Sequence, residues 1–347
     1  MARIGRIVLH IGKHKTGSSS IQASLSGVEQ DGFCYAPLPS DNHASAFSVF
    51  SRRLSERKNK LRLRGREEAK GRRGMNLQHL EGVLEGSCRT LFFSAEMLEN
   101  FKKPEVEGLI DYLSGYTDRI EVVGFVRPPR SSSVSAFQER IKHGWDRDHL
   151  PKGVYRKSFA PYIARLGAEA VHILPFVPSQ FVNGSLVDTL LHAIGEPEIV
   201  YEEKRMNESM AGDAVKLLYS FNRSGRFQKL GQQNVRARTR LWKMVGATIA
   251  GAKLQLPADC HTPGRAPEEV EWLKSVTGID FTADLEGMEE RESRASKRLL
   301  RAMRKISDDA VLQLQDLVRS ETKRRVSSPL EGMAALYQAY GGSEEVA

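Results

Sequence analysis

The chain has 347 residues, of which 40% are apolar and 27% are charged. A chain of this length can bury a sizeable core, as one large domain or two ordinary ones, and its composition excludes a disordered or a membrane-embedded protein. Lysine and arginine (52) exceed aspartate and glutamate (43), which gives a net charge of +9. That excess predicts an anionic partner, but charge alone does not choose among a nucleotide, a polyanionic glycan, nucleic acid and a membrane surface.

The cysteines and the N-terminal residues predict the compartment. Cys34, Cys88 and Cys260 are widely spaced and odd in number, which fits neither a zinc site nor a secreted disulfide framework, so we expect reduced, mostly buried thiols. The sequence contains no run of about 18 apolar residues, so we expect no membrane-spanning helix. Residues 1–11 carry two arginines and run into a strand-like block, unlike a secretion signal, so we expect a cytoplasmic protein.

Four short apolar runs predict buried strands, at residues 4–11, 90–94, 120–126 and 171–176. Stretches with helical spacing lie between them, at 18–25, 77–84, 104–113, 131–142 and 159–166. Strands that alternate with helices in this way predict right-handed β-α-β units. The expected fold is therefore α/β, with a central, mostly parallel sheet flanked by helices and a P-loop-like strand-loop-helix at its start.

The chain after about residue 177 is predicted to be helical. The clearest segments are 186–194, 212–221, 237–249, 266–276 and a long amphipathic helix over 289–319. The apolar stripe of this last helix indicates packing on the same chain or, alternatively, a homodimer contact. We therefore expect an α/β domain over residues 1–284 and a helical C-terminal extension over 285–347.

A basic block stands out at residues 51–74. It holds eleven lysines and arginines against three glutamates, or +8 of the chain's +9. Such a block is usually a solvated loop or helix, and the alternative is a docking surface for an anionic polymer or lipid headgroup. No nucleic-acid-binding motif surrounds it, so we expect no nucleic-acid partner.

The first chemical motif is HIGKHKTGSSSIQ, at residues 10–22, between the first strand and the first helix. Gly12 and Gly17 allow a turn that points backbone N–H groups inward, and the helix N-terminus adds partial positive charge. Serines at that end supply hydroxyl donors. Although a glycine-serine turn can serve as a tight turn alone, the lysines inside this loop favour a cradle for a phosphate-sized anion.

The spacing of the two glycines matches the phosphate loop of nucleotide triphosphatases, but the lysine does not. That motif needs lysine directly after the second glycine, where this chain has Ser18. The lysines are Lys13 and Lys15, inside the loop. Apart from Glu96, no carboxylate is obviously placed for magnesium at the end of a later strand.

A second anion-binding motif follows the strand at 120–126. Arg127 stands at the strand end, Pro128 and Pro129 begin the turn, and Ser135 lies eight positions after the arginine on the next helix. A guanidinium offers a fork of donors to a phosphate, and a serine on the inward helix face adds a hydroxyl. Ligands of open α/β sheets bind outside the carboxyl ends of the strands, so the two motifs are expected to converge there.

Together these motifs resemble the sulfotransferases that use 3′-phosphoadenosine 5′-phosphosulfate (PAPS), in particular bacterial and carbohydrate-type members. Their 5′-phosphosulfate loop has the form K-x-G-[ST]-[ST], commonly with proline before the lysine, where this chain has His14. The resemblance spans about residues 4–210 in layout and is sharp only at 10–22 and 127–142.

The resemblance implies a role for each matching residue. Lys15 would contact the bridging oxygen and the transferring sulfonate, and Arg127 and Ser135 would bind the 3′-phosphate. The 5′-phosphate would be held by the loop after Lys15, namely by Gly17, Ser18 and Ser19, with Thr16 and Ser20 flanking them. The family requires no metal.

Sulfonate transfer to a hydroxyl needs a base within hydrogen-bond reach of that hydroxyl. Glu96 follows the strand at 90–94 at the expected rim of the site, and members of the family that use glutamate place it similarly. Other members of the family use a histidine as the base, and His43 is the candidate for that role in this chain. His10 lies within the first strand and is expected to be packed.

The resemblance implies an enzyme that transfers a sulfonate from PAPS to a hydroxyl of a glycan, a glycolipid or a similar acceptor and releases adenosine 3′,5′-bisphosphate (PAP). Two alternatives stay open. One is a P-loop kinase or nucleotide hydrolase, which would require magnesium. The other is a non-catalytic adaptor that binds a polyanion or a membrane through residues 51–74.

Overall fold

The computed structural model describes residues 4–12, 15–51, 65–206, 209–225 and 231–343, except for the side chains of residues 65–73. The chain divides into two compact units. Unit 1 comprises Met1–Pro128, Val154–Asn207 and Glu268–Phe281. Unit 2 comprises Pro129–Gly153, Glu208–Pro267 and Thr282–Ala347.

Unit 1 contains a six-stranded sheet in the order β2-β3-β4-β1-β5-β6. All neighbouring strands are parallel except the short pair β2 and β3. The strands are β1 (Arg6–His10), β2 (Glu29–Gln30), β3 (Phe33–Tyr35), β4 (Thr90–Ser94), β5 (Ile120–Val126) and β6 (Val171–Pro175). The α/β fold class is confirmed, as are the four predicted strands.

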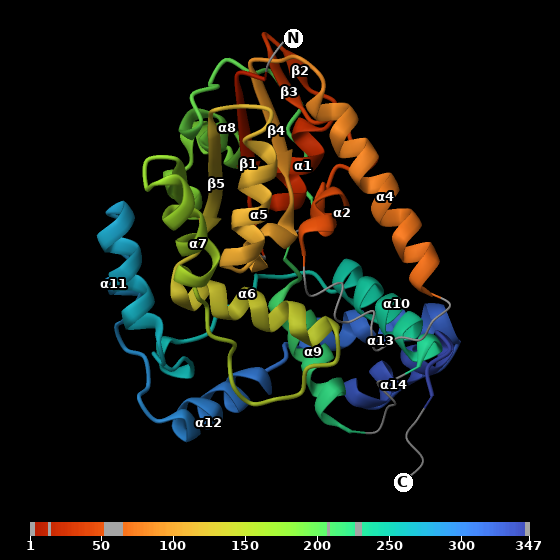
Figure 1. Cartoon of the computed structure of the whole chain (residues 1–347). Helices are drawn as coiled ribbons and strands as arrows, with labels where there is room; N and C mark the ends of the chain where they lie inside the picture. The colour runs from red at the N-terminus through yellow and green to blue at the C-terminus, as the bar shows by residue number, and fades with distance from the viewer. Residues whose placement is uncertain (1–3, 13–14, 52–64, 207–208, 226–230, 344–347) are drawn as a thin grey trace. The chain divides into compact units, whose positions relative to one another are not determined.

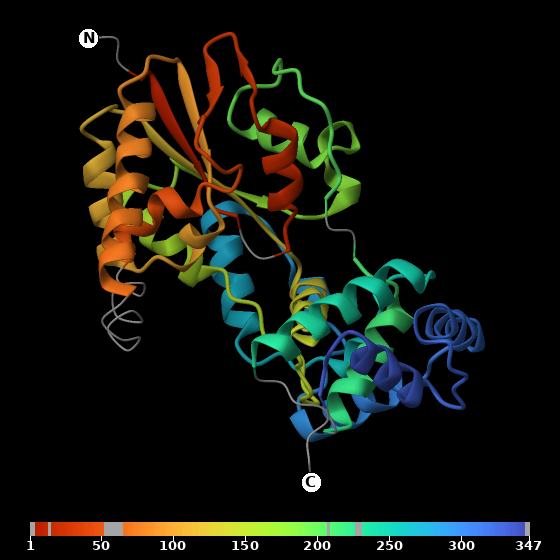
Figure 2. The same ribbon diagram turned by 90° about the vertical axis from the view of Figure 1, so that its right-hand side faces the viewer.

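Helices cover both faces of this sheet, which explains why β1, β4 and β5 are buried along their whole length. One face carries α1 (Ser18–Leu25) and α8 (Leu186–Ala193), and the other carries α4 (Gly65–Leu84), α5 (Lys103–Leu113) and α7 (Arg156–Leu166) (Figures 1 and 2). Ile21 and Leu25 of α1 and Leu190 of α8 pack against Val8 and Phe92 of the sheet. The short α2 (Ala44–Phe47) contacts α4.

Unit 2 is helical. Its helices are α6 (Pro129–Lys142), α9 (Gly212–Arg223), α10 (Gln232–Thr248), α12 (Glu292–Met303), α13 (Asp308–Thr322) and α14 (Pro329–Ala339). They share one apolar core that includes Phe137, Leu241, Leu314 and Tyr337. Most of α11 (Ala266–Thr277) belongs to unit 1 instead, where Glu269 accepts a hydrogen bond from the backbone amide of Tyr155 at 2.6 Å.

The long helix predicted over 289–319 is wrong as a single element, because the structure divides it into α12 and α13. Ser307 stands at the break with extended backbone (ψ 151°), and its Oγ accepts a hydrogen bond from the Ala310 amide at 3.2 Å, which caps α13. Asp213 of α9 accepts a hydrogen bond from the same hydroxyl at 2.6 Å. A serine at this position is a common N-cap and marks the start of a new helix. The apolar spacing continues across Ser307 and therefore did not show the break.

The apolar stripes of α12 and α13 pack into the core of unit 2 through Leu299, Met303 and Leu314. Residues 282–347 form this unit together with 129–153 and 208–267. The compact units therefore do not follow the expected boundary at residue 285, and the two-domain division at that point stays a prediction.

Three other expectations concern the surface and the thiols. In the basic block, residues 52–64 lie outside the described residues, and α4 begins at Gly65, twelve residues earlier than the predicted start at 77. The three cysteines are free thiols, as predicted, but only Cys260 is fully buried. Within the described ranges, no helix is long and apolar enough to cross a membrane.

Candidate functional site

The predicted site residues of unit 1 follow strands that end at one edge of the sheet. The glycine-serine loop follows β1, Glu96 comes two residues after β4, and Arg127 directly follows β5. Strand β1 lies between β4 and β5, and the chain builds one side of the sheet (β3 and β4) before it returns to the other (β5 and β6). The loop therefore lies at the switch point of the topology, where open α/β sheets bind their ligands.

Two glycines shape the loop. A Cβ atom on Gly12 would lie 2.4 Å from Ser18 Oγ and 3.0 Å from Glu96 Cγ, so only glycine leaves room for both side chains. Gly17 has a φ of 78° and stands at the N-cap of α1, where its carbonyl accepts the amide of Ile21 at 3.1 Å. Lys15 also has a positive φ, of 66°. This conformation is costly for a residue with a side chain and is concentrated at functional sites.

Ser18 is the loop residue whose side chain most directly indicates a ligand. The residue is 4% exposed, and among the described residues its Oγ has no hydrogen-bond partner. A buried hydroxyl without a partner costs about 1–3 kcal/mol, so this atom is suited to a ligand at the start of α1. Thr16 is buried beside it in the chain, and Ser19 is half-buried.

Ser20 and Ser24 of α1 both bind the segment before residue 207. Ser20 Oγ accepts a hydrogen bond from the amide of Met206 at 2.9 Å, and one turn later Ser24 Oγ accepts the amide of Lys204 at 2.8 Å. Both serines thus hold the segment before residue 207 against α1. The expected place of Ser20 beside the 5′-phosphate stays a prediction. Lys13 and His14 lie outside the described residues.

Arg127 lies against the loop. Its Nε donates a hydrogen bond to the carbonyl oxygen of Lys15, and its guanidinium stacks on the ring of Phe176, 3.9 Å from the centroid. The Tyr155 hydroxyl donates to the Arg127 carbonyl at 2.6 Å and fixes the backbone. Burial lowers the pKa of the guanidinium to about 10, which leaves it charged at neutral pH. A desolvated guanidinium of this kind is a strong partner for a phosphate.

Glu96 lies at the rim of the same loop. It begins the 3-10 helix η2 (Glu96–Asn100) directly after Ala95, whose amide donates to the carbonyl of His10 at 3.0 Å. The side chain is half-buried. Its Cγ lies against Gly12, as Ser18 Oγ does. The Glu96 side chain and the glycine-serine loop are therefore neighbours within unit 1.

His43 is buried (1% exposed) beside Ser94, the last residue of β4. The Ser94 amide donates to His43 Nδ1 at 3.1 Å, and the His43 amide donates to the Ser94 carbonyl at 2.9 Å. Burial lowers the pKa of the imidazole to about 4, despite the opposing charge of Asp41. His10 is fully buried too, with Nδ1 2.8 Å from Ser94 Oγ and a pKa that burial lowers to about 3.

Ser135 belongs to unit 2, on α6, and is half-buried there. Its pairing with Arg127 of unit 1 stays a prediction. Two residues of this edge, Phe176 and Ser94, were not predicted from the sequence as part of the site. Both stand at or just after the carboxyl end of a strand, β6 and β4, and this position is the signal that could have identified them.

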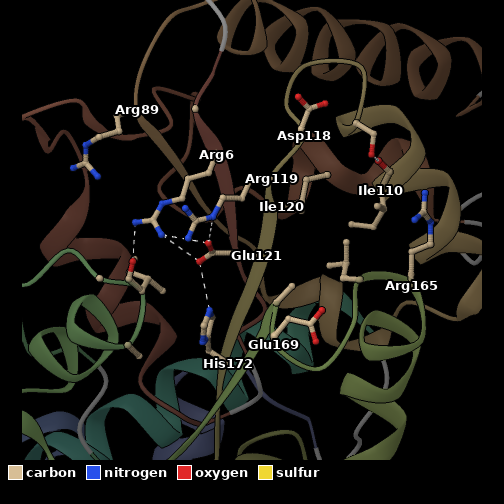
Figure 3. Close-up of a pocket in the computed structure, with 17 residues that line it drawn as sticks. Arg6, Arg89, Ile110, Asp118, Arg119, Ile120, Glu121, Arg165, Glu169 and His172 are labelled. Atoms are coloured by element: carbon tan, nitrogen blue, oxygen red, sulfur yellow. Dashed lines mark hydrogen bonds and ion pairs between the residues drawn. The ribbon is translucent and has the colours of Figure 1, made fainter.

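A large open pocket of about 1020 Å³ lies at the other edge of the sheet, where the strands begin (Figure 3). Its lining includes Arg6, Arg119, Glu121 and His172. Arg6 and Arg119 both pair with Glu121, at 3.3 and 2.7 Å. None of the predicted site residues lines this pocket. Arg6, Arg119 and His172 all contact Glu121, so we assign this cluster to the stability of the sheet.

Comparison with known proteins adds little. The sequence matches no protein-family model and no curated protein. A solved structure, that of a sulfotransferase from Alicyclobacillus acidocaldarius, is similar with a TM-score of 0.37 and 15% sequence identity, over 69% of this chain and 95% of that chain.

Proposed function

We propose that the protein is a sulfotransferase that transfers a sulfonate from PAPS to a hydroxyl group of an acceptor. The observation that carries the proposal is the loop after β1, in which Gly17 opens helix α1 and the buried Ser18 Oγ lacks a partner among the described residues. The residues present fit the donor: Gly17, Ser18 and Ser19 provide a cradle for its 5′-phosphate at a helix N-terminus.

Arg127 is the residue we assign to the 3′-phosphate of the donor. Its charge is desolvated and held by Lys15 and Phe176, so a phosphate there would meet a preorganised cation. Ser135 would add a hydroxyl, as the resemblance implies. The triphosphatase alternative gains no support, since position 18 is serine.

Glu96 is the residue we assign as the base. It would accept the proton of the acceptor hydroxyl while the hydroxyl oxygen forms a bond to sulfur. The bond between sulfur and the bridging oxygen breaks in the same transfer, and that oxygen leaves with the electron pair on the 5′-phosphate of PAP. Lys15 would neutralise the charge that develops on it. We expect the acceptor to be a glycan, a glycolipid or a similar hydroxyl compound.

Thermal unfolding with PAP, ATP or GTP, each with and without magnesium, tests this function. A ligand at 100 times its dissociation constant stabilises the folded state by about 2.7 kcal/mol, a shift of a few degrees for a chain of this size. The expected result is a metal-independent shift with PAP that exceeds the shift with ATP. A shift that requires ATP and magnesium, with none from PAP, would instead support the kinase.

A further inference from the structure

The backbone amide of Ser94 determines which tautomer of the His43 imidazole is present. A backbone N–H can only donate, so the bond from the Ser94 amide makes His43 Nδ1 an acceptor that carries no proton. The neutral imidazole must then carry its proton on Nε2. A second hydrogen bond, from the His43 amide to the Ser94 carbonyl, fixes the backbone of His43 beside the end of β4.

The other ring nitrogen is unsatisfied. His43 is 1% exposed, and its Nε2 has no hydrogen-bond partner within the described part of the chain. The ring packs on Tyr35, with centroids 4.7 Å apart, and meets Phe93 edge-on at 5.7 Å. An N–H donor buried among aromatic rings without an acceptor costs about 1–3 kcal/mol. A donor kept at this cost is explained if an acceptor arrives with a ligand.

From this geometry, and resting on the sulfotransferase function proposed above, we propose that His43 is a hydrogen-bond donor to the transferring sulfonate. Its Nε2–H stabilises negative charge on a sulfonate oxygen and takes no proton from the acceptor. The base is then Glu96 alone, and the choice between the two residues that the sequence leaves open is resolved. Ser94 is the positioning residue, because it holds His43 in the donor form.

The surroundings of His43 agree with a neutral donor. Burial lowers the pKa of the ring to about 4, and the opposing charge of Asp41 does not restore it. Tyr35 has its pKa raised by burial and donates its proton to the Asp41 carbonyl at 2.5 Å, so it is a neutral neighbour at working pH. An imidazole that stays neutral can polarise an oxygen without itself changing charge.

Nitrogen-15 NMR of histidine-labelled protein tests the proposal without any turnover. The two ring nitrogens of His43 should report the Nε2–H form, with no titration between pH 5 and 8, and His43→Gln identifies the signal by its loss. PAPS should shift the Nε2–H resonance more than PAP does, because only PAPS carries the sulfonate. A ring that titrates near 6.5, or an Nε2–H signal that PAPS leaves unchanged although PAPS binds, would overturn the proposal.

Two substitutions separate a donor from a base. His43→Gln keeps an N–H donor close to the ε position but has no basic nitrogen, whereas His43→Phe keeps only the ring shape. For a donor, we expect turnover within about tenfold of wild type in the first and a loss of about 100-fold or more in the second. Equal losses in both would assign His43 as the base. His192→Gln, at an exposed position on α8, is the matched control.

Different results would contradict the sulfotransferase function and the role of His43. If the wild-type protein binds neither PAP nor PAPS, the sulfotransferase function is wrong, and the sulfonate role of His43 falls with it. If both ligands bind but the His43 signal reports an Nδ1–H form, the function stands and only the role of His43 is wrong. Thermal unfolding of both variants shows whether they are folded.

Discussion

Arg6 and Glu196 form a buried ion pair, with Nη2 2.6 Å from Oε1 and the two residues 8% and 4% exposed. The same guanidinium reaches Glu121 at 3.3 Å, so one arginine at the start of β1 joins the start of β5 to the turn after α8. Without Arg6, Glu196 keeps Arg89 and Glu121 keeps Arg119, each at 2.7 Å, so both buried carboxylates lose one charged partner but not all of them. We therefore expect Arg6→Met to lower the free energy of unfolding by about 1–3 kcal/mol in a urea titration.

The matched control is the exposed pair Lys103 and Glu107 on α5, whose side chains are 72% and 44% exposed at a separation of 3.9 Å. Lys103→Met should change the free energy of unfolding by less than about 0.5 kcal/mol. Equal effects of the two substitutions would show that burial of the Arg6 pair is unimportant.

Protonation of the Glu121 carboxylate is expected to lower the free energy of unfolding in acid. Burial raises its pKa, but the His172 side chain at 3.4 Å and the charges of two arginines outweigh burial and hold it at about 2, against an ordinary value of 4.5. A depressed folded-state pKa gives stability that is complete above about pH 4.5 and is lost as the pH falls towards 2. Urea titrations from pH 6 to 3 should show this decline, and Glu121→Gln should flatten it. A parallel decline in the variant would exclude Glu121 as its source.

Gly12 is expected to tolerate no side chain. In Gly12→Ala the new methyl group would displace Ser18 Oγ, at 2.4 Å, or Glu96 Cγ, at 3.0 Å. We expect a destabilisation of about 1–3 kcal/mol and weaker PAP binding by calorimetry. Gly82→Ala on α4 is the control, because nothing lies within 4 Å of the added atom. It should stabilise the protein by up to about 1 kcal/mol.

Ser18→Ala separates stability from ligand binding. The hydroxyl is buried without a partner in the described structure, so its removal should leave the free energy of unfolding unchanged or higher. The same substitution should weaken PAP binding by about 5- to 15-fold, the value of a hydrogen bond of about 1–1.5 kcal/mol. A variant that is destabilised and binds PAP normally would show that Ser18 is structural.

Lys15 and Arg127 are expected to differ in what they control. Lys15→Ala should lower turnover far more than PAP affinity, because its charge acts on the departing oxygen. Arg127→Ala should weaken PAP binding itself by about 10- to 150-fold, the value of a charged hydrogen bond of about 1.5–3 kcal/mol. Calorimetry and single-turnover assays measure the two effects. Two variants that bind and turn over like wild type would show the site assignment to be wrong.

The sheet could be predicted from the sequence because its strands are short apolar runs buried on both faces, as in β4 and β5. The predicted ranges 90–94 and 120–126 match these strands at both ends. The short strands β2 and β3 were missed, since two or three residues are too few to show a period. The break at Ser307 was missed because the apolar spacing continues across it, although Ser307 caps α13 by accepting a hydrogen bond from the Ala310 amide.

The site was predicted in part, for a similar reason. The loop at 12–20 and Arg127 carry local signals, a glycine pair and an arginine after a strand. The form of His43 depends instead on the amide of Ser94, fifty-one residues away. No local pattern encodes that bond, and the sequence alone favoured Glu96 as the base and left His43 open as the alternative.

The two edges of the sheet will respond differently to engineering. At the edge where the strands begin, Arg6, Glu121 and Glu196 already satisfy one another. At the edge where they end, the described residues leave Ser18 Oγ and the Nε2 atoms of His10 and His43 without partners. Substitutions that stabilise the fold at Ser18 or His43 will therefore remove a contact that we assign to the ligand, so heat tolerance gained there comes with a loss of function.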